Sequence, residues 1–484
     1  MPDRVSPAPA SAGSTRSALV GPLVYCAMLI IGVGAFLAIR SVGESLVAPA
    51  ATQVLPNSPA AAPKIDVVFH VLATLAAIIA LGLVLGRLLR WLGQPPVIGE
   101  VLAGIVLGPS LLGALSPQAA QFFVPGPAED PAGVVVSALT AVSRLGIVLY
   151  MFLVGLELNL PQLRHRAHAA VAISHASILL PFVLGAGLAL WIYPRLSSAD
   201  VAFTSFALFM GAAMAITAFP VLARILTDQQ LEKTELGGVA LSCAAADDIT
   251  AWCLLAFVIG MAQSQLAEAV YVVLGATAYV AVMIMVVRPM VHRMLARWDD
   301  REFPSWLFPT LLVAIFISAL LTKQIGIHTL FGGFTMGVVL SGNDRLNAMM
   351  RSKLQDLATI LLLPAFFAIT GLRTQISLLD TPSDWLITGL IILVATLGKF
   401  GGTLAAARLT GLGWRESSAL GVLMNTRGLM ELIALNIGLE IGIISPRLFA
   451  MMVIMALVTT VATAPILRWL LGPVPAVRAS VSHT

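Results

Sequence analysis

The sequence predicts an all-α polytopic membrane protein built from two inverted repeats, and three observations carry this prediction. Of its 484 residues, 58% are hydrophobic and only 11% are charged, and the mean hydropathy is +0.95. A soluble protein of this length needs far more charge on its surface. The apolar residues are grouped into segments long enough to cross a bilayer, and segments in the two halves of the chain resemble each other. The small net charge of +4 gives no reason to expect a nucleic-acid partner.

Fourteen apolar segments are long enough to span a bilayer, whose core needs about 20 residues of helix. A polar tail at 1–17 precedes the first span at 18–39, which is too long for the apolar region of a signal peptide, so we expect it to be retained. A linker rich in proline and alanine at 40–65 leads into a membrane domain at 66–471, and a short tail follows at 472–484. The thirteen spans of the membrane domain are expected at about 66–86, 95–115, 133–158, 168–193, 202–226, 235–262, 266–290, 304–322, 325–341, 357–376, 384–409, 416–437 and 446–471.

The distribution of positive charge supports this number of spans. With the N-terminus in the cytoplasm, nineteen of the 28 Lys and Arg residues fall on cytoplasmic segments and six on external ones. Three fall within spans: Arg144, Lys399 and Arg427. This asymmetry is the positive-inside pattern, so we expect both termini in the cytoplasm. Arginine outnumbers lysine 23 to 5, which is typical of a GC-rich bacterial genome, and the expected location is the inner cell membrane.

An internal repeat relates the two halves of the membrane domain, about 66–262 and 304–471. The span at 133–158 ends with a Gly-Leu pair at Gly155, and the span at 357–376 has the same pair at Gly371. The span before each of them is also similar, with "AGIVLG" in one and "GGFTMG" in the other. The shift is seven helices, an odd number, so the halves face opposite ways across the membrane. Inverted repeats are the architecture of secondary transporters, which bind their substrate near the bilayer midplane between the repeats.

The repeat pairs the span at 202–226 with the span at 416–437, and both are interrupted. In the first, Pro220 removes a helical hydrogen bond. In the second, the interruption is a polar run that forms a helix poorly at this depth: Asn425, Thr426 and Arg427. Two matched interrupted helices are the best indication of a transport site that a sequence offers.

Two adjacent carboxylates, Asp247 and Asp248, lie in the middle of the span at 235–262. A carboxylate at this depth is costly unless it is protonated, paired or hydrated. Two like charges so close also repel, so we expect at least one of them to be held neutral. Carboxylate oxygens suit hard cations such as Na⁺ or K⁺, and a carboxylate that holds either a proton or a cation makes the two compete. The alternative is that one or both aspartates are structural partners of a buried base.

Other polar residues in the spans are expected to support this site. Lys399 is the expected partner of one aspartate, either releasing it when a cation arrives or forming a permanent structural salt bridge. Thr217, three residues before Pro220, either ligates a cation through its hydroxyl or bonds its own helix. Arg427 cannot deprotonate, so we expect it to compensate the carbonyl ends of broken helices or to pair with Glu431.

Seven stretches resemble the monovalent cation:proton antiporters, particularly the branch with Kef-type potassium transporters and plant cation/proton exchangers. They cover most of 66–471 in the expected order. They are "QPPVIGEVLAGIVLGPSLLG" (94–113), "FLVGLELN" (152–159), "AMAITAFPVLARIL" (213–226), "CAAADDITAW" (243–252), "FFAITGLRT" (366–374), "LGKFGGT" (397–403) and "NTRGLMELIALNIGL" (425–439).

The resemblance implies a sodium/proton-antiporter-like fold in which two broken helices cross beside Asp248, the ion and proton carrier. It also implies a homodimer and an elevator-like motion of a core domain against a dimerisation domain. No cofactor is expected. Many Kef-like relatives carry a nucleotide-binding domain after the last helix, and none is expected on this chain. Several relatives have Asn or Gln where this chain has Asp247, and paired aspartates with a core lysine resemble electrogenic sodium exchangers instead. The choice between Na⁺ and K⁺ therefore stays open.

Two other classes of function fit the sequence less well. A cation channel would need a filter built from rings of carbonyls or charges, and none is recognisable. An intramembrane aspartyl protease uses aspartates on two helices, and a membrane prenyltransferase binds Mg-diphosphate through D-D-x-x-D, whereas here the pair is followed by Ile-Thr-Ala-Trp. The sequence therefore predicts a secondary transporter that exchanges a monovalent cation for protons, and not an enzyme.

Overall fold

The computed structural model describes residues 14–46, 66–126, 130, 133–157, 167–231, 234–263, 266–296, 303–326 and 328–472. These residues form helices joined by turns, with no strand among them, which confirms the predicted all-α class. Most of the expected N-terminal tail, most of the proline- and alanine-rich linker and nearly all of the C-terminal tail lie outside the described residues.

Each predicted span corresponds to a helix or to a pair of half-helices. The unbroken ones are α1 (Ser14–Gly43), α2 (Val67–Trp91), α3 (Pro96–Leu107), α6 (Val134–Glu157), α8 (Ala167–Leu196), α11 (Glu235–Gln263), α12 (Leu266–Val282), α14 (Leu307–Ile325), α15 (Thr329–Leu340), α17 (Leu363–Arg373), α18 (Pro382–Leu409) and α21 (Pro446–Leu471). The two pairs are α9 (Phe203–Ala215) with α10 (Phe219–Asp228), and α19 (Trp414–Met424) with α20 (Leu429–Glu440). Ten helical stretches of the described residues are long and apolar enough to cross a membrane.

One expected span is divided at a proline. The span expected at 95–115 ends its regular helix at Leu107, and Gly108 is extended because a residue before proline avoids the α conformation. Two short helices follow it, α4 (Leu112–Leu115) and α5 (Pro117–Phe123). The remaining helices, α13 (Arg288–Leu295) and α16 (Asp344–Asp356), join α12 and α17 through π-helical turns.

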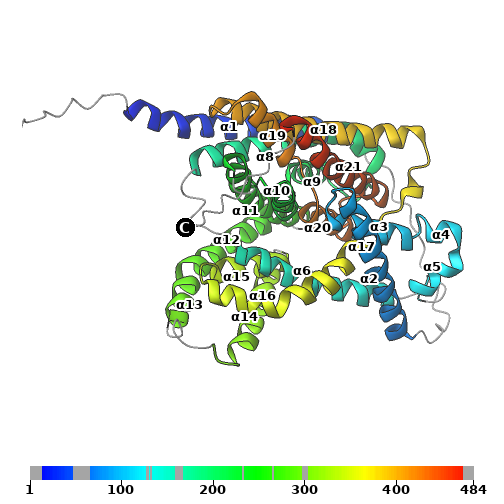
Figure 1. Cartoon of the computed structure of the whole chain (residues 1–484). Helices are drawn as coiled ribbons and strands as arrows, with labels where there is room; N and C mark the ends of the chain where they lie inside the picture. Colours follow the sequence, from blue (N-terminus) through cyan, green and yellow to red (C-terminus); the bar gives the residue numbers. More distant parts are fainter. Residues whose placement is uncertain are drawn as a thin grey trace, which may run out of the picture.

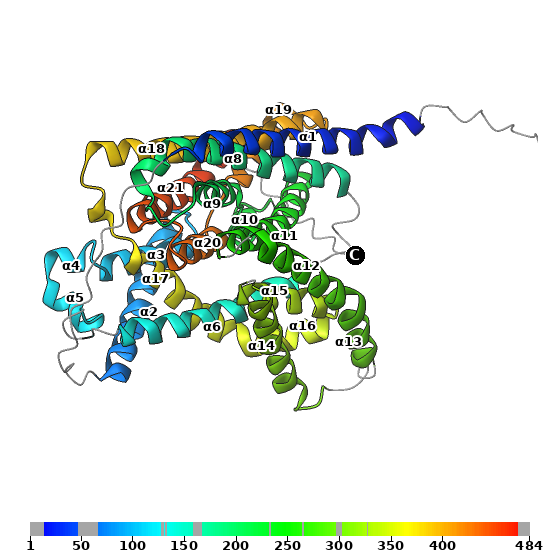
Figure 2. The ribbon, with the colours of Figure 1, turned by 180° about the vertical axis from the view of Figure 1, so that it is seen from behind.

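The helices pack in two groups (Figure 1). In the core group, α8 packs against α18, α9 and α11, and α21 packs against α18, α19 and α20, with α10 beside α11. In the panel group, α6 packs against α15 and α17, α3 packs against α2 and α17, and α14 packs against α15. The view from behind shows the same division, with α12 running from the core group to the panel group (Figure 2).

Matched glycines let the panel helices cross at backbone contact. A Cβ atom added to Gly155 of α6 would lie 2.2 Å from the Phe334 carbonyl oxygen of α15. A Cβ atom added to Gly371 of α17 would lie 2.2 Å from the Val101 carbonyl oxygen of α3. The two glycines of the sequence repeat therefore occupy equivalent crossings, because only small residues let membrane helices approach so closely.

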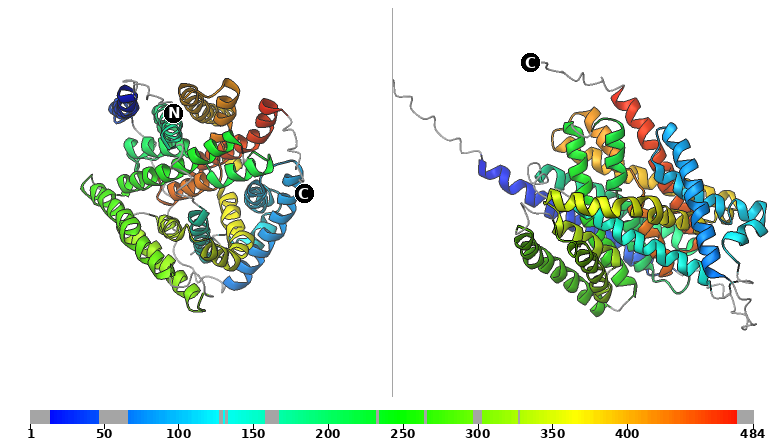
Figure 3. Two further views of the ribbon diagram at one scale, coloured as in Figure 1. Left: turned by 60° about the vertical axis from the view of Figure 1, so that its left-hand side comes forward. Right: turned by 60° about the horizontal axis from the view of Figure 1, so that its bottom comes forward.

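The extra N-terminal helix, α1, lies on the outer surface of the core group. It packs against α8 and α9, with Gly32 facing Leu179 and Gly43 facing Phe203. Viewed more nearly along the helices, α1 lies at the rim of the molecule (Figure 3, left).

Candidate cation and proton site

The two interrupted helices break next to each other in the core group. Residues 216–218 separate α9 from α10, and residues 425–428 separate α19 from α20. The Ala218 amide donates a 3.0 Å hydrogen bond to the Thr426 carbonyl oxygen, so the breaks are bonded backbone to backbone. Pro220 does not lie in the break: it is the second residue of α10, where the missing N–H leaves no helical bond unmade. Proline therefore belongs to the first turn of the second half-helix.

The hydroxyl of Thr460, on α21, hydrogen-bonds with the polar backbone groups of Arg427 in the second break. The Arg427 amide donates to Thr460 Oγ1 over 3.1 Å, and that hydroxyl donates to the Arg427 carbonyl oxygen. Irregular backbone at membrane depth persists only where protein or water satisfies its polar groups. Thr460 is such a partner, although nothing in the sequence distinguishes it from other threonines of the spans.

Asp247, on α11, is completely buried and surrounded by donors. Lys399 Nζ of α18 lies 2.7 Å from its Oδ2 atom, and Thr217 Oγ1 donates to the same oxygen over 2.7 Å. Two serines of α8 also donate, Ser174 over 2.5 Å to Oδ1 and Ser177 over 3.0 Å to Oδ2. Lys399 is as fully buried as Asp247. The structure thus brings together three residues singled out from the sequence and adds two serines that were not.

Thr217 connects the break of α9 to both Asp247 and α19. Its hydroxyl lies 2.7 Å from Asp247 Oδ2 and 3.1 Å from the Met424 carbonyl oxygen. A hydroxyl has one proton to donate and can accept through its lone pairs. The Thr217 hydroxyl can therefore donate its proton either to Asp247 Oδ2 or to the Met424 carbonyl oxygen. In both cases the lone pairs of its oxygen remain free to accept a hydrogen bond or to contact a cation.

Asp248 has a different environment from its neighbour. It is 2% exposed, and its Oδ1 atom has no hydrogen-bond partner among the described residues. The backbone amide of Phe219, at the start of α10, donates a hydrogen bond to its carboxylate. The start of a helix carries a partial positive charge, so α10 is oriented to favour negative charge on Asp248. The Asp247 carboxylate is thus saturated by four side-chain donors, whereas the Asp248 carboxylate keeps one oxygen without a hydrogen bond from the described residues.

Asn425 supplies a second buried oxygen of this kind. It is the first residue of the second break, and its Oδ1 atom is likewise without a hydrogen-bond partner in the part of the chain that the structure describes. Its Nδ2 atom is within 3.5 Å of Thr396 Oγ1 on α18, and the side chain is 8% exposed. Leaving a buried oxygen unpaired is costly, so such oxygens mark places that a proton, a water or a cation can occupy.

Arg427 closes the end of α9. Its Nη1 and Nη2 atoms donate to the carbonyl oxygens of Ala213 and Met214, over 3.1 Å and 2.9 Å. Nη1 also lies 2.9 Å from Glu431 Oε2, and both charged side chains are fully buried. The guanidinium therefore compensates the negative end of α9 and forms an ion pair with Glu431 in the first turn of α20. Among the described residues, no cluster of three or more His, Cys, Asp and Glu side chains could hold a resident metal ion.

Comparison with known proteins places the chain among exchangers. Residues 73–471 match the family described as "Sodium/hydrogen exchanger, transmembrane". The Na⁺/H⁺ antiporter NhaS4 of Synechocystis is 43% identical over 399 residues, which cover 82% of this chain and 96% of that protein. The cation/H⁺ antiporter 15 of Arabidopsis thaliana is 37% identical, and the K⁺/H⁺ antiporter 1 of Saccharomyces cerevisiae is 33% identical. The matches cover 81% and 77% of this chain but only 46% and 43% of those two longer proteins.

The fold also matches a solved structure. The sodium proton antiporter MjNhaP1 of Methanocaldococcus jannaschii superposes with a TM-score of 0.59 at 15% identity, covering 83% of this chain and 96% of that one. At this identity the match concerns the fold.

Proposed function

The chain belongs to the sodium/hydrogen exchanger family, and on that premise we propose that it exchanges Na⁺ or K⁺ for protons at Asp248, with Asp247 and Lys399 as the adjoining charge pair. Family membership makes the protein a multi-pass cation:proton antiporter rather than an enzyme. The assignment of the site to these residues, and the choice of cation, are our proposal. The observation that carries it is the contrast between the saturated Asp247 and the unsaturated Asp248.

The charges of the core group support Asp248 as the carrier. Around the two breaks, four other fully buried charged side chains of the described residues form two ion pairs, Asp247 with Lys399 and Arg427 with Glu431. These four charges cancel, so Asp248 alone decides the net charge. Protonated Asp248 leaves the site neutral, and ionised Asp248 leaves one negative charge that a single monovalent cation neutralises. Because an uncompensated charge is costly in hydrocarbon, the site holds either a proton or a cation but is seldom empty.

The ligands for a cation would come from the breaks and from the aspartates. Asp248 Oδ1 and Asn425 Oδ1 are among the buried oxygens of the described residues that have no hydrogen bond, and the Thr217 hydroxyl can turn its lone pairs toward a cation. Sodium and potassium both prefer oxygen ligands of this type. Thr426 belongs to the site through its backbone, since its carbonyl oxygen joins the two breaks.

The Asp247–Lys399 pair would set the stoichiometry. A cation that draws Asp247 toward itself weakens the hold of Asp247 on Lys399, and a desolvated lysine then releases its proton. Ser174, Ser177 and Thr217 would still donate to Asp247 in that state. Two protons would then move against one cation, and transport would carry net charge. The competing reading is a permanent structural salt bridge, which would leave exchange electroneutral.

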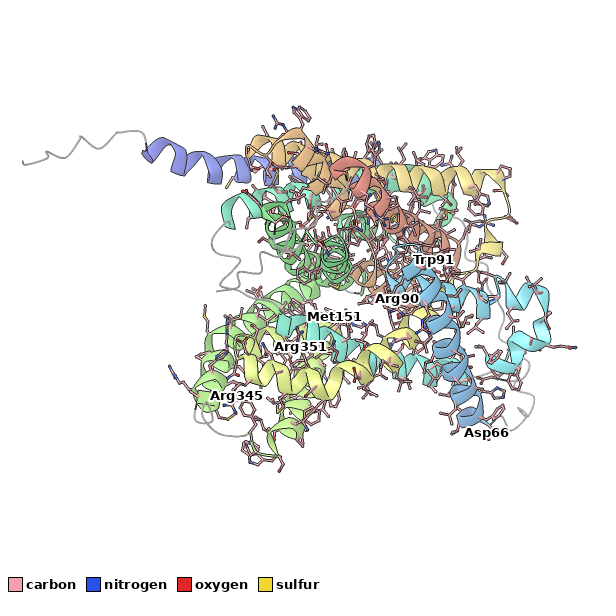
Figure 4. The ribbon with its side chains drawn as sticks, in the orientation of Figure 1. Asp66, Arg90, Trp91, Met151, Arg345 and Arg351 are labelled. Carbon is pink, nitrogen blue, oxygen red and sulfur yellow. The ribbon has the colours of Figure 1, made fainter. Side chains whose placement is uncertain are left out.

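We further propose a homodimer in the inner cell membrane, with both termini in the cytoplasm. The distribution of Lys and Arg supports this orientation. In Figure 4, Arg345 and Arg351 on α16 lie at one end of the molecule and Asp66, which caps α2, lies at the other. The end bearing α16 would face the cytoplasm. Attachment of a reporter to either terminus tests the orientation, and the mass of the protein in nanodiscs tests the dimer.

Exchange in proteoliposomes tests the proposed function. A pH gradient should collapse when Na⁺ or K⁺ is added and persist with choline, and the effective cation identifies the substrate. Asp248→Asn, which keeps the side chain's size and removes its proton, should abolish the response without loss of folded protein. Competition predicts that a higher cation concentration relieves inhibition at acidic pH. Exchange at the parent rate in Asp248→Asn would refute the carrier assignment.

A further inference from the structure

A cluster of charged side chains joins the two helix groups at the end of α20 farthest from its break. Glu440, the last residue of α20, accepts from two arginines of the panel group. Arg373, at the end of α17, donates from Nη1 to Glu440 Oε1 over 2.9 Å, and Arg144 of α6 donates from Nη2 to Glu440 Oε2. One carboxylate of the core group is therefore held between two guanidinium groups of the panel.

A second set of hydrogen bonds reinforces the same contact. Arg373 Nη1 also donates to Asn436 Oδ1 over 3.1 Å, one helical turn before Glu440. Asn436 Nδ2 in turn donates to Thr370 Oγ1 of α17 over 2.8 Å. These bonds run between α20 of the core group and α17 of the panel group, so any displacement of one group against the other must break them.

The space around the cluster is open on one side and nearly closed on the side nearer the break. A cavity of about 620 Å³ beside it is lined by Arg144, Lys323 and Glu440. At the cluster itself only about 30 Å³ remains, and Ile433, two turns nearer the break on α20, is 2% exposed there. In the topology given by the positive-inside rule, this end of α20 faces the outside. The closed side of the cluster thus points toward the candidate site.

We propose that Glu440, Arg373 and Arg144 form an outer latch, which holds the core group against the panel group while the external path is closed and opens once in each transport cycle. The inference rests on the proposed function for the alternation itself. Glu440 is then a positioning residue: it contacts neither cation nor proton at the site but sets how often the external side is open. Partly desolvated, doubly hydrogen-bonded ion pairs are strong enough to bias such an equilibrium.

The position Ile433 provides a test that does not need transport. In a background with Cys26, Cys243 and Cys253 replaced by Ala, Ile433→Cys should react slowly with a membrane-impermeant maleimide added from outside. Glu440→Gln should raise that rate about tenfold, the factor that corresponds to about 1.4 kcal/mol of bias toward the open state. Arg373→Gln should act in the same direction, which covers the case in which Glu440→Gln fails to fold.

A matched control removes a different ion pair at the same side of the molecule. Arg447 Nη2 and Asp380 Oδ1 lie 3.4 Å apart, and the two side chains are 40% and 66% exposed. Asp380 lies just before α18 and Arg447 in the first turn of α21. Asp380→Asn should leave the labelling rate of Ile433→Cys unchanged. Labelling that is no faster in the Glu440 and Arg373 variants than in the parent, or equally faster in Asp380→Asn, would overturn the latch.

Cross-linking gives the converse test. Arg373→Cys combined with Glu440→Cys, bridged by a short bis-maleimide, should stop exchange, whereas the same two cysteines capped singly should exchange at a measurable rate. Continued exchange in the bridged protein would overturn the proposal. Failure of the unmodified parent to exchange cations for protons would instead refute the proposed function, and the labelling result would still report on the latch.

Discussion

Lys399 Nζ and Asp247 Oδ2 lie 2.7 Å apart, and neither side chain has any exposed surface. An ion pair in this position is not by itself a source of stability, since both ions have lost their hydration. Removing both partners is tolerated, but removing only one leaves the other charged and buried, which is strongly destabilising. Variants of this pair can therefore distinguish an effect on the stability of the protein from an effect on transport.

Lys399→Gln should lower the free energy of unfolding by about 3–5 kcal/mol, because Asp247 is left without a counter-charge. Asp247→Asn combined with Lys399→Gln should recover most of that loss, since neither charge is then present. Thermal unfolding in detergent measures both, and Lys323→Gln, which removes an exposed lysine, serves as the control. A double variant no more stable than Lys399→Gln would show that the two side chains do not depend on each other.

The same lysine should make exchange sensitive to membrane potential. If Lys399 releases a proton when the cation binds, the parent protein moves net charge, and an inside-negative potential should change its rate. Residual exchange by Lys399→Gln should be indifferent to potential. A thiocyanate gradient can set the potential in proteoliposomes without K⁺ present. A parent protein that ignores the potential would favour the permanent salt bridge.

Thr217→Val should weaken cation transport by raising the apparent KM severalfold, because it removes a hydroxyl that contacts both Asp247 and the Met424 carbonyl oxygen. Loss of a hydrogen bond to a charged group also costs about 1.5–3 kcal/mol of stability. Thr217→Ser retains the hydroxyl and should stay close to the parent in both respects. An equal loss of transport in the serine variant would place the effect in the methyl group and not in the hydroxyl.

Arg427→Lys should destabilise the protein although it preserves the charge. A lysine ammonium cannot reproduce the planar fork that reaches the Ala213 and Met214 carbonyl oxygens and Glu431 together. The expected loss is about 1.5–3 kcal/mol, with the exchange rate falling in proportion to the folded protein. Comparing rate per folded molecule separates the outcomes: a fall in that quantity would mean that Arg427 takes part in transport directly.

Residue chemistry and spacing were sufficient to predict part of this site. Adjacent aspartates in an apolar span, a lysine in another and two matched interruptions are each anomalous in a membrane, so each is visible in isolation. Ser174, Ser177 and Thr460 are not anomalous, because serine and threonine occur often in membrane helices bonded to their own backbone. Their role depends on which helices lie side by side, and the packing of α8 on α18 or of the second break on α21 leaves no local signal.

The position of the first break shows the same limit. The sequence predicts that proline interrupts the helix where it stands, yet the non-helical residues precede it and Pro220 is the second residue of α10. Proline is tolerated in the first turn of a helix as well as being a breaker of its interior. Which of the two applies depends on the Ala218–Thr426 hydrogen bond, a contact between halves of the chain more than 200 residues apart.

All the fully buried ionic partners named here belong to helices or breaks of a single group: Asp247 on α11, Lys399 on α18, Arg427 between α19 and α20, and Glu431 on α20. A rigid shift of that group past the panel would carry every charge together with its counter-charge. The electrostatic self-energy of the set would then stay nearly constant along the path, since no ion pair is pulled apart inside hydrocarbon. Only the ion pairs of Glu440 with Arg144 and Arg373 would separate. These side chains are partly exposed, so water can hydrate the separated ions.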